Sequence, residues 1–183
     1  DINLLTTKIQ NFDKTISTIP TYDLLSTEIR NHQVMYEGSS RRIKRSIYFN
    51  IKSFKFVDDE FYEKVKDINL ISEYLDRKLR EIAESKKNIP HAERIINGQQ
   101  LTNIGLFRNY VLNYLKNNPK VDQDEIVLVR QLEISPQGMP LEIYCFANKA
   151  ELVDYERIQA DIFDHILTAA QEFDLEIMQV AKA

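Results

Sequence analysis

The stretch 125-EIVLVRQLEISPQGMPLEIYCFA-147 predicts two consecutive β-strands and sets the interpretation of the rest of the chain. Residues 125–134 are apolar on both faces, as expected of a central strand. Residues 135–140, with two prolines and a glycine, have the composition of a turn. Residues 141–147 predict the second strand, in which successive side chains alternate between the two faces. We therefore expect a strand-turn-strand unit within a sheet.

Helical patterns flank these strands. Residues 102–118 predict a helix that begins at the N-cap Thr102, ends before Pro119 and carries an apolar stripe of Ile104, Phe107, Val111 and Tyr114. Residues 151–173 predict a second helix with a stripe of Tyr155, Ile158, Ile162, Ile166, Ala169 and Phe173. Residues 58–87 predict a third, mostly charged helix at the surface, with a narrow stripe of Ile71, Leu75, Leu79 and Ile82.

Residues 47–56 predict a strand with a break. Its apolar side chains sit on odd positions up to Ile51 and on even positions from Phe54. A period of two cannot change parity within a regular strand, so we expect a bulge or bend near Lys52 and Ser53.

Together with a closing strand at residues 175–180, these elements run β-α-β-β-α-β, with a helical insertion before the main crossover helix. This order predicts a ferredoxin-like plan with both crossover helices on one face of a four-stranded antiparallel sheet. The predicted fold class is α+β: a partial small β domain, residues 1–37, followed by a ferredoxin-like domain with a helical insertion, residues 38–183.

Residues 1–37 predict short strands at 2–10, 15–19 and 27–34, with one helical turn after Pro20. They carry too few large apolar side chains to bury a core alone. We therefore expect them to pack on another part of a longer protein or on another subunit. The chain opens on Asp1 rather than Met, which also suggests a fragment.

Composition excludes several classes of function. The chain has 183 residues and a net charge of −4, which argues against a general nucleic-acid binder. Its one cysteine, Cys145, excludes an intramolecular disulfide and is predicted to be a core thiol rather than a nucleophile. Only 4 glycines are present, so a Gly-rich phosphate loop of the usual form is excluded. No apolar run approaches the ~20 residues of a membrane-spanning helix.

Asp161 and His165 are the strongest candidates for chemistry, because residues four apart lie on the same side of a helix. Both flank the apolar stripe, however, and the following turns of that side offer no third ligand. Since metal sites need three or four convergent ligands, we predict a solvated or interface-edge pair and no metal site. A distant residue such as His91 is the alternative third ligand.

Two surface features suggest contacts between subunits. Phe163, Leu167 and Ala170 lie to one side of the apolar stripe, which indicates either a wide core contact or a subunit interface. Residues 36–42 have linker composition, and four cations fall between 41 and 45: Arg41, Arg42, Lys44 and Arg45. These cations either face solvent or contact a phosphate or lipid headgroup. Residues 151–176 hold eight acids and one arginine, which suits contacts with such a basic run.

Five stretches together resemble the cytosolic part of small-conductance mechanosensitive channels, and most closely their miniconductance branch. They are QNFDKTISTIPTYDLLS (10–26), GSSRRIKRSI (38–47), LTNIGLFRNYVLNYLKNNP (101–119), VRQLEISPQGMPLEIYCFANK (129–149) and YERIQADIFDHI (155–166). The likeness covers nearly the whole chain in the same order, and it is most specific from residue 41 and from residue 101 onward.

The resemblance implies a homo-oligomeric, heptameric channel of the bacterial inner membrane that opens under membrane tension in osmotic downshock. Ions and small solutes would be its permeants, and its membrane helices would precede Asp1. Residues 1–37 would be the last strands of the β domain below the pore. Residues 38–183 would build the cytosolic cage with its portals. No catalytic residue, cofactor or nucleic-acid partner is implied.

Two other functions remain open from the residues alone. Ferredoxin-like domains often bind metabolites, so a small-ligand regulatory module is the main alternative. A metal-dependent enzyme that uses Asp161 and His165 is the other. For the channel fragment, the predicted subunit-interface residues are Phe163, Leu167, Arg41, Arg42, Lys44 and Arg45.

Overall fold

The computed structural model describes residues 5–10, 15–26 and 39–179. The chain divides into two compact units, residues 1–34 and 35–183. Within the described ranges, none of the helices combines the length and the apolarity needed to cross a lipid bilayer.

The first unit contains an antiparallel pair of strands, β1 (Thr6–Gln10) and β2 (Ile16–Pro20), followed by the short helix α1 (Thr21–Ser26). The pairing runs from Thr6 opposite Pro20 to Gln10 opposite Ile16. The third strand predicted at 27–34 lies outside the described residues. Leu5, Ile16 and Tyr22 are exposed, so the described part of this unit leaves apolar side chains uncovered.

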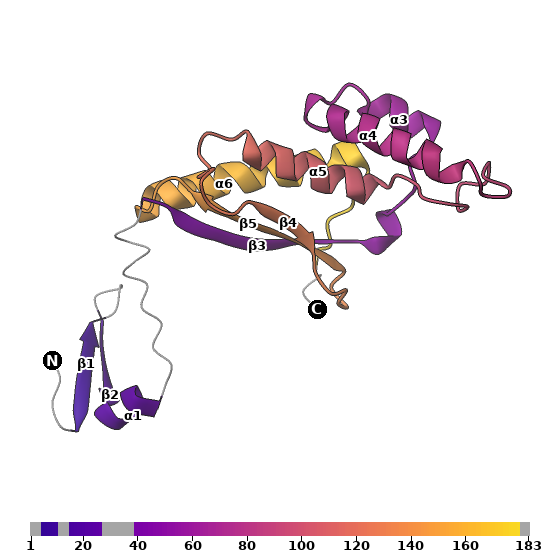
Figure 1. Cartoon of the computed structure of the whole chain (residues 1–183). Helices are drawn as coiled ribbons and strands as arrows, with labels where there is room; N and C mark the ends of the chain where they lie inside the picture. The colour runs from indigo at the N-terminus through magenta and orange to yellow at the C-terminus, as the bar shows by residue number, and fades with distance from the viewer. Residues whose placement is uncertain (1–4, 11–14, 27–38, 180–183) are drawn as a thin grey trace. The chain divides into compact units, whose positions relative to one another are not determined.

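The second unit is built on an antiparallel sheet of β3 (Arg41–Phe49), β5 (Met139–Ala147) and β4 (Leu128–Gln131), in that spatial order (Figure 1). The helices α5 (Asn103–Lys116) and α6 (Leu152–Ala169) lie along one face of this sheet. A 3₁₀ turn, η2 (Ala170–Phe173), extends α6. The arrangement confirms the predicted α+β fold class.

The predicted closing strand at residues 175–180 was wrong as a full strand. Among the described residues it makes one antiparallel bridge, Phe49 opposite Ile177. Two backbone hydrogen bonds flank it: Asn50 N donates to Glu176 O and Met178 N to Tyr48 O, both at 2.8 Å. The segment therefore takes the position beside β3 that the ferredoxin-like plan assigns to its last strand, but over too short a length to form a ladder.

The prediction that residues 125–134 form a central strand was also wrong. Only Leu128–Gln131 pair, and in the described sheet they pair with β5 alone. Three apolar side chains of this segment are exposed: Ile126 at 65%, Leu128 at 39% and Ile134 at 62%. The segment is therefore an edge strand, and apolar residues on both of its faces did not indicate burial on both faces. The central position belongs to β5, which pairs on both sides and is mostly buried on both faces.

The basic run, residues 41–45, is part of β3 and not of a linker. The strand then stops at Phe49, and a 3₁₀ turn, η1 (Ile51–Ser53), follows. Asn50 caps this turn by accepting a hydrogen bond from Lys52 N at 3.0 Å. The predicted break near Lys52 and Ser53 is confirmed, and the physical reason is the change of parity in the apolar pattern.

The insertion contains two helices, α3 (Asp59–Val65) and α4 (Asn69–Lys86), where one helix was predicted over 58–87. At 100° per residue, the buried side chains of α3 and those of α4 point about 80° apart on a continuous helix. The turn between them brings both sets onto the core. In Figure 1, α4 lies on the side of α5 that faces away from the sheet.

The core lies between the sheet and the helices α5 and α6, and its centre is aromatic. Phe107 of α5 meets Phe49 and Phe173 edge to face, at centroid distances of 5.6 and 5.4 Å. The N-cap predicted at Thr102 is confirmed, since its hydroxyl accepts from Gly105 N at 3.2 Å. The predicted stripe of α6 is buried except for half-buried Ala169.

Candidate functional site

The basic run is divided between the two faces of β3. On the helix side, the guanidinium of Arg41 lies 4.5 Å from the ring centre of Tyr155, and that of Arg45 lies 4.3 Å from Phe163. On the open side, Arg42 and Lys44 lie beside β5. Arg42 is 6.0 Å from the Tyr144 ring, so each of these three arginines has an aromatic neighbour in its own subunit.

A buried carboxylate accounts for part of the charge on the open face. Glu142 on β5 is 4% exposed, and its Oε1 accepts from Arg130 Nε at 2.8 Å, with Nη2 at 2.7 Å. Lys44 Nζ lies 3.7 Å from the other carboxylate oxygen. Because a buried carboxylate is stable only when it is paired, these two cations are structural partners of β5. Sequence reasoning missed this cluster, although an acid within an apolar strand was a usable signal.

The predicted apolar interface residues have different surroundings. Phe163 is 4% exposed and Ala170 is fully buried, so both belong to the core of their own subunit. This supports a wide core contact and corrects the expectation that Phe163 offers apolar surface to a neighbouring chain. Leu167 is half-buried against the same core. A subunit contact through Leu167 and the cations of 41–45 stays a prediction.

Asp161 and His165 are engaged by two different partners. Asp161 Oδ2 pairs with Lys120 Nζ at 2.6 Å, in the segment that follows α5. His165 stacks on Tyr114 with ring centres 4.1 Å apart, and its Nε2 lies 2.7 Å from the hydroxyl of Tyr110. Across the described ranges, no group of three or more His, Cys, Asp or Glu is placed to hold a metal ion. The pair is a contact between α6 and the α5 region.

Cys145 lies in the centre of β5 and is fully buried. Burial raises the pKa of its thiol to about 12. The thiolate is therefore negligible at neutral pH, which confirms the prediction of a core thiol.

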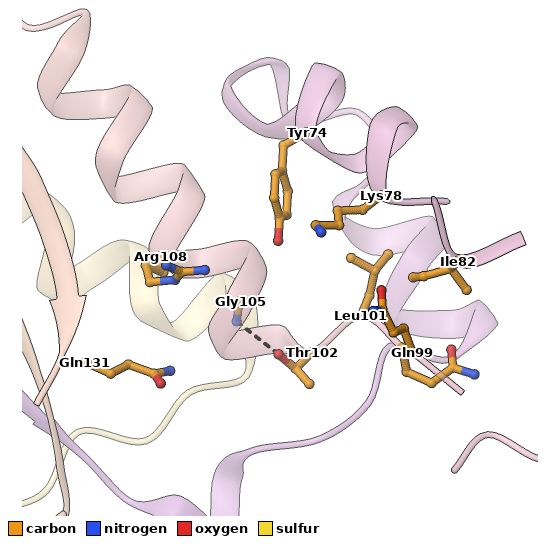
Figure 2. A pocket seen from close by; sticks show the side chains of 10 residues that line it. Tyr74, Lys78, Ile82, Gln99, Leu101, Thr102, Gly105, Arg108 and Gln131 are labelled. Carbon is orange, nitrogen blue, oxygen red and sulfur yellow. Dashed lines mark hydrogen bonds between the residues drawn. The ribbon is translucent and has the colours of Figure 1, made fainter. Parts of the chain in front are cut away.

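A hollow of about 480 Å³ lies between α4, α5 and β4 (Figure 2). Its lining includes Tyr74 and Lys78 from α4, Gly105 and Arg108 from α5, and Gln131 from β4. The volume is within the ~300–1,000 Å³ range of small-molecule sites. Sequence analysis missed this hollow, because its walls come from segments about 30 residues apart in the chain.

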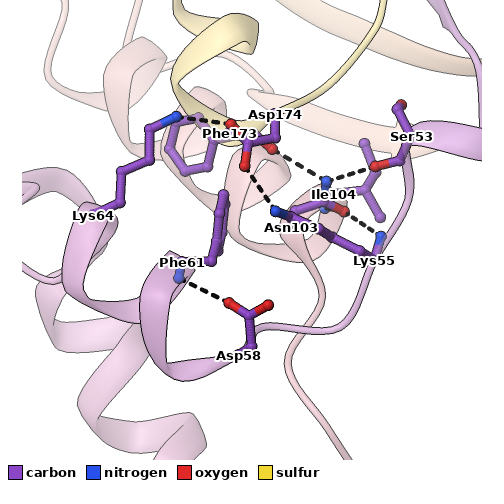
Figure 3. Close-up of polar contacts among 9 residues, drawn as sticks. All are labelled: Ser53, Lys55, Asp58, Phe61, Lys64, Asn103, Ile104, Phe173 and Asp174. Atoms are coloured by element: carbon purple, nitrogen blue, oxygen red, sulfur yellow. Dashed lines mark hydrogen bonds and ion pairs between the residues drawn. The ribbon is translucent and has the colours of Figure 1, made fainter.

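A polar junction joins the strand break to the ends of α5 and α6 (Figure 3). The buried amide of Asn103 donates to Ser53 O at 2.9 Å and to Phe173 O at 3.1 Å. Its Oδ1 accepts from Lys55 N at 3.1 Å and from Ile104 N at 2.8 Å. One side chain thus satisfies backbone groups of three separate segments, which fixes the start of α5.

The same junction includes Asp174, which adopts a left-handed backbone at φ 52° directly after η2. Lys55 Nζ and Lys64 Nζ each lie 2.8 Å from its carboxylate. Hydrogen bonds from these two lysines hold the pKa of Asp174 below its ordinary value. Since Lys64 belongs to α3, the ion pair ties the insertion to the end of α6.

Two family descriptions match this sequence. Residues 1–34 match "Mechanosensitive ion channel, beta-domain", and residues 73–177 match "Mechanosensitive ion channel MscS, C-terminal". The second match covers more than half of the chain. Both descriptions belong to channels and not to enzymes.

Two solved structures are similar to this chain in fold. Two structures of MSL1 from Arabidopsis thaliana are 14% identical to this chain, with TM-scores of 0.53 and 0.54. They cover 98% and 97% of this chain, which in turn spans 47% and 45% of theirs. The closed-state MscS of Helicobacter pylori is 12% identical, with a TM-score of 0.46, and covers 100% of this chain and 52% of its own. The two family matches, in this order along one chain with this fold, show that the protein belongs to the MscS family of mechanosensitive ion channels.

Proposed function

We propose that this chain is the cytosolic part of a channel that opens under membrane tension and relieves osmotic downshock. The observation that carries the proposal is the succession of a channel β-domain match at 1–34 and a channel C-terminal match at 73–177. This chain spans 47% and 45% of the two MSL1 chains, and in this proposal the pore lies in sequence beyond these 183 residues.

In this proposal the full-length protein is a heptamer of the bacterial inner membrane, in the miniconductance branch, with this part on the cytoplasmic side. The α/β units of neighbouring subunits form a cage, and ions and small solutes pass through the portals between them. The charges of the α/β unit support such contacts. Arg42 and Lys44 are exposed on the open face, and α6 and η2 present exposed acids at Glu156, Asp164 and Glu172.

The test uses the full-length gene expressed in bacterial spheroplasts that lack their own tension-gated channels. Suction on excised patches is expected to evoke a conductance that is absent from cells with an empty vector. Expression should also raise survival after a rapid shift to low osmolarity. Correctly inserted protein that gives no current at any tension short of patch rupture would contradict the proposal.

The contact between subunits can be tested on the 183-residue chain. If ionic contacts matter, the association measured by sedimentation should weaken as the salt concentration rises from about 0.05 to 0.5 M. The Debye length shortens over that range, so charge pairs are screened more strongly. If the apolar contact matters, Leu167→Ser should weaken association and leave the fold intact. Phe163→Ser is unsuitable as a surface probe because this side chain is buried. Association that responds to neither change would place the contact elsewhere, for example at a sheet edge.

A further inference from the structure

We propose that the hollow between α4 and α5 binds a small molecule that carries an oxyanion, either a carboxylate or a phosphate, through Arg108 and Lys78. This goes beyond the channel function, because it assigns a ligand to the cytosolic part itself. The site combines side chains of the insertion with those of the main crossover helix and the edge strand β4.

Figure 2 shows polar groups from both helices directed into one space: the Tyr74 hydroxyl, Lys78 Nζ and the Arg108 guanidinium. The Gln131 amide points into it from β4. Two cations from different elements therefore face the same volume, which is the arrangement that binds an oxyanion from two sides.

The charge of the lining is unbalanced. Its ten residues include Lys78 and Arg108 and contain no Asp or Glu. In the part of the chain that the structure describes, no carboxylate lies within ion-pair distance of Arg108. Lys78 pairs with Glu81 one turn along the same helix, and such an exposed pair is weak enough to exchange for a ligand. A chain of net charge −4 thus keeps a cationic, acid-free hollow.

The remaining lining defines what kind of anion fits. One wall of the hollow is apolar and consists of Leu101, Ile82 and the ring of Tyr74. Such a wall suits a ligand with a short carbon skeleton. Amides for neutral hydrogen bonds come from Gln99, Gln100 and Gln131. Gly105 lies in the lining too, and an added Cβ there would come within 2.9 Å of the Thr102 hydroxyl, so a larger residue would disturb the helix cap.

Binding in the hollow should stabilise the insertion, and this effect can be measured. A ligand held by Lys78 and Arg108 bridges α4 to α5 and stabilises the folded position of the insertion by mass action. Amide protons of α4 should therefore exchange more slowly when the ligand is bound, whereas those of β5 should not change.

The experiment titrates the 183-residue chain with inorganic phosphate or L-glutamate by calorimetry, with sodium chloride adjusted to constant ionic strength. Hydrogen exchange of α4 is the second readout. The variants are Arg108→Gln and Lys78→Gln. The matched control is Arg80→Gln, an exposed cation two residues from Lys78 and about 200° around α4.

The expected result is saturable binding of at least one probe, weakened by about tenfold or more in Arg108→Gln, as loss of a charge-assisted hydrogen bond implies. Lys78→Gln should weaken binding as well, and Arg80→Gln should leave it unchanged. Preference for phosphate would assign a phosphate-bearing ligand, and preference for glutamate a carboxylate-bearing one.

Three outcomes would overturn the proposal. One is the absence of saturation by either probe up to about 10 mM. Another is binding that Arg108→Gln leaves intact or that Arg80→Gln weakens equally, since the effect would then be general charge. The third is that Arg108→Gln or Lys78→Gln changes the association of chains but not the binding of either probe. The occupant of the hollow would then be a carboxylate of another subunit.

Discussion

Helices α5 and α4 lie side by side, and both are amphipathic, yet they contribute very differently to the core. α5 buries six of its 14 residues, whereas α4 buries three of its 18, so α4 is attached along a narrow strip. The rest of α4 carries exposed ion pairs such as Lys78 with Glu81. Such pairs add little stability, which implies that the insertion opens before the sheet does.

The largest effect is expected from a cavity beneath α5. Phe107→Ala removes a fully buried ring that contacts Phe49 and Phe173, and it should cost about 3–5 kcal/mol of unfolding free energy. Protection from hydrogen exchange should fall throughout the α/β unit, and urea denaturation should show the loss.

The matching cavity in α4 should act locally. Leu75→Ala should cost about 2–3 kcal/mol, with the loss of protection confined to α3 and α4. Leu79→Ala is the control, since Leu79 lies on the same stripe but is 37% exposed. If Leu75→Ala lowered protection of β5 by the same amount, the insertion and the sheet would be one cooperative unit.

The next effect concerns the start of α5. Asn103→Ala leaves backbone groups of Ser53, Lys55 and Phe173 without their partner in a buried site, at an expected cost of about 2–3 kcal/mol. In Asn109→Ala the lost amide donates, among the described residues, to the carbonyl of Gly105 on the same helix, so the cost should be less than about 1 kcal/mol. Equal losses in urea denaturation would show that the junction has no special role.

A smaller, pH-dependent effect is expected at the link between α3 and the end of α6. Asp174→Asn keeps a residue that tolerates the left-handed backbone but removes the charge, and should cost about 0.5–1 kcal/mol at pH 7, since the site is partly exposed and screened. The pKa of Asp174 is lowered on folding. Its contribution is therefore complete above the unfolded pKa of about 3.9 and is lost as pH falls through the folded value.

The measurement is thermal unfolding of wild type and variant between pH 7 and pH 2. The two stabilities should begin to converge below about pH 4 and should meet once the pH falls below the lowered pKa of folded Asp174. A constant difference over the whole range would mean that the loss comes from geometry and not from charge.

The smallest effect is expected at Asp161, on the exposed side of α6. Asp161→Asn breaks the pair with Lys120, in which both side chains are about half exposed, and should cost less than about 0.5 kcal/mol. Metal content by mass spectrometry should be equal in variant and wild type. A stoichiometric metal that disappears with the substitution would instead establish the pair as a metal site.

Local patterns in the sequence were sufficient for much of this fold. The cap at Thr102, the strand β5 and the break after Phe49 each depend on neighbours within a few residues. The position of β4 could not be predicted in this way. Apolar side chains on both faces give the same sequence pattern whether the strand is central or lies at the edge of the sheet.

The candidate sites depend on more distant residues. Asp161 and His165 are spaced as a ligand pair, but Lys120 and Tyr110, 41 and 55 residues away, bind them separately. Asn103 likewise bonds to segments 50 and 70 residues away, and nothing in its own stretch indicates a buried hub. For Phe163 the sequence left a core contact and a subunit interface both open, because nothing in its own stretch indicates that Arg45 of β3 lies over its ring.

The buried thiol of Cys145 also provides an internal reporter. It is the only cysteine in the chain, and both its burial and its raised pKa prevent attack on a disulfide reagent while β5 stays paired. Its labelling rate therefore measures how often the centre of the sheet opens. A single cysteine introduced at the exposed Arg80 would react much faster than Cys145, so spectroscopic labels can be placed on the insertion without first removing the native residue.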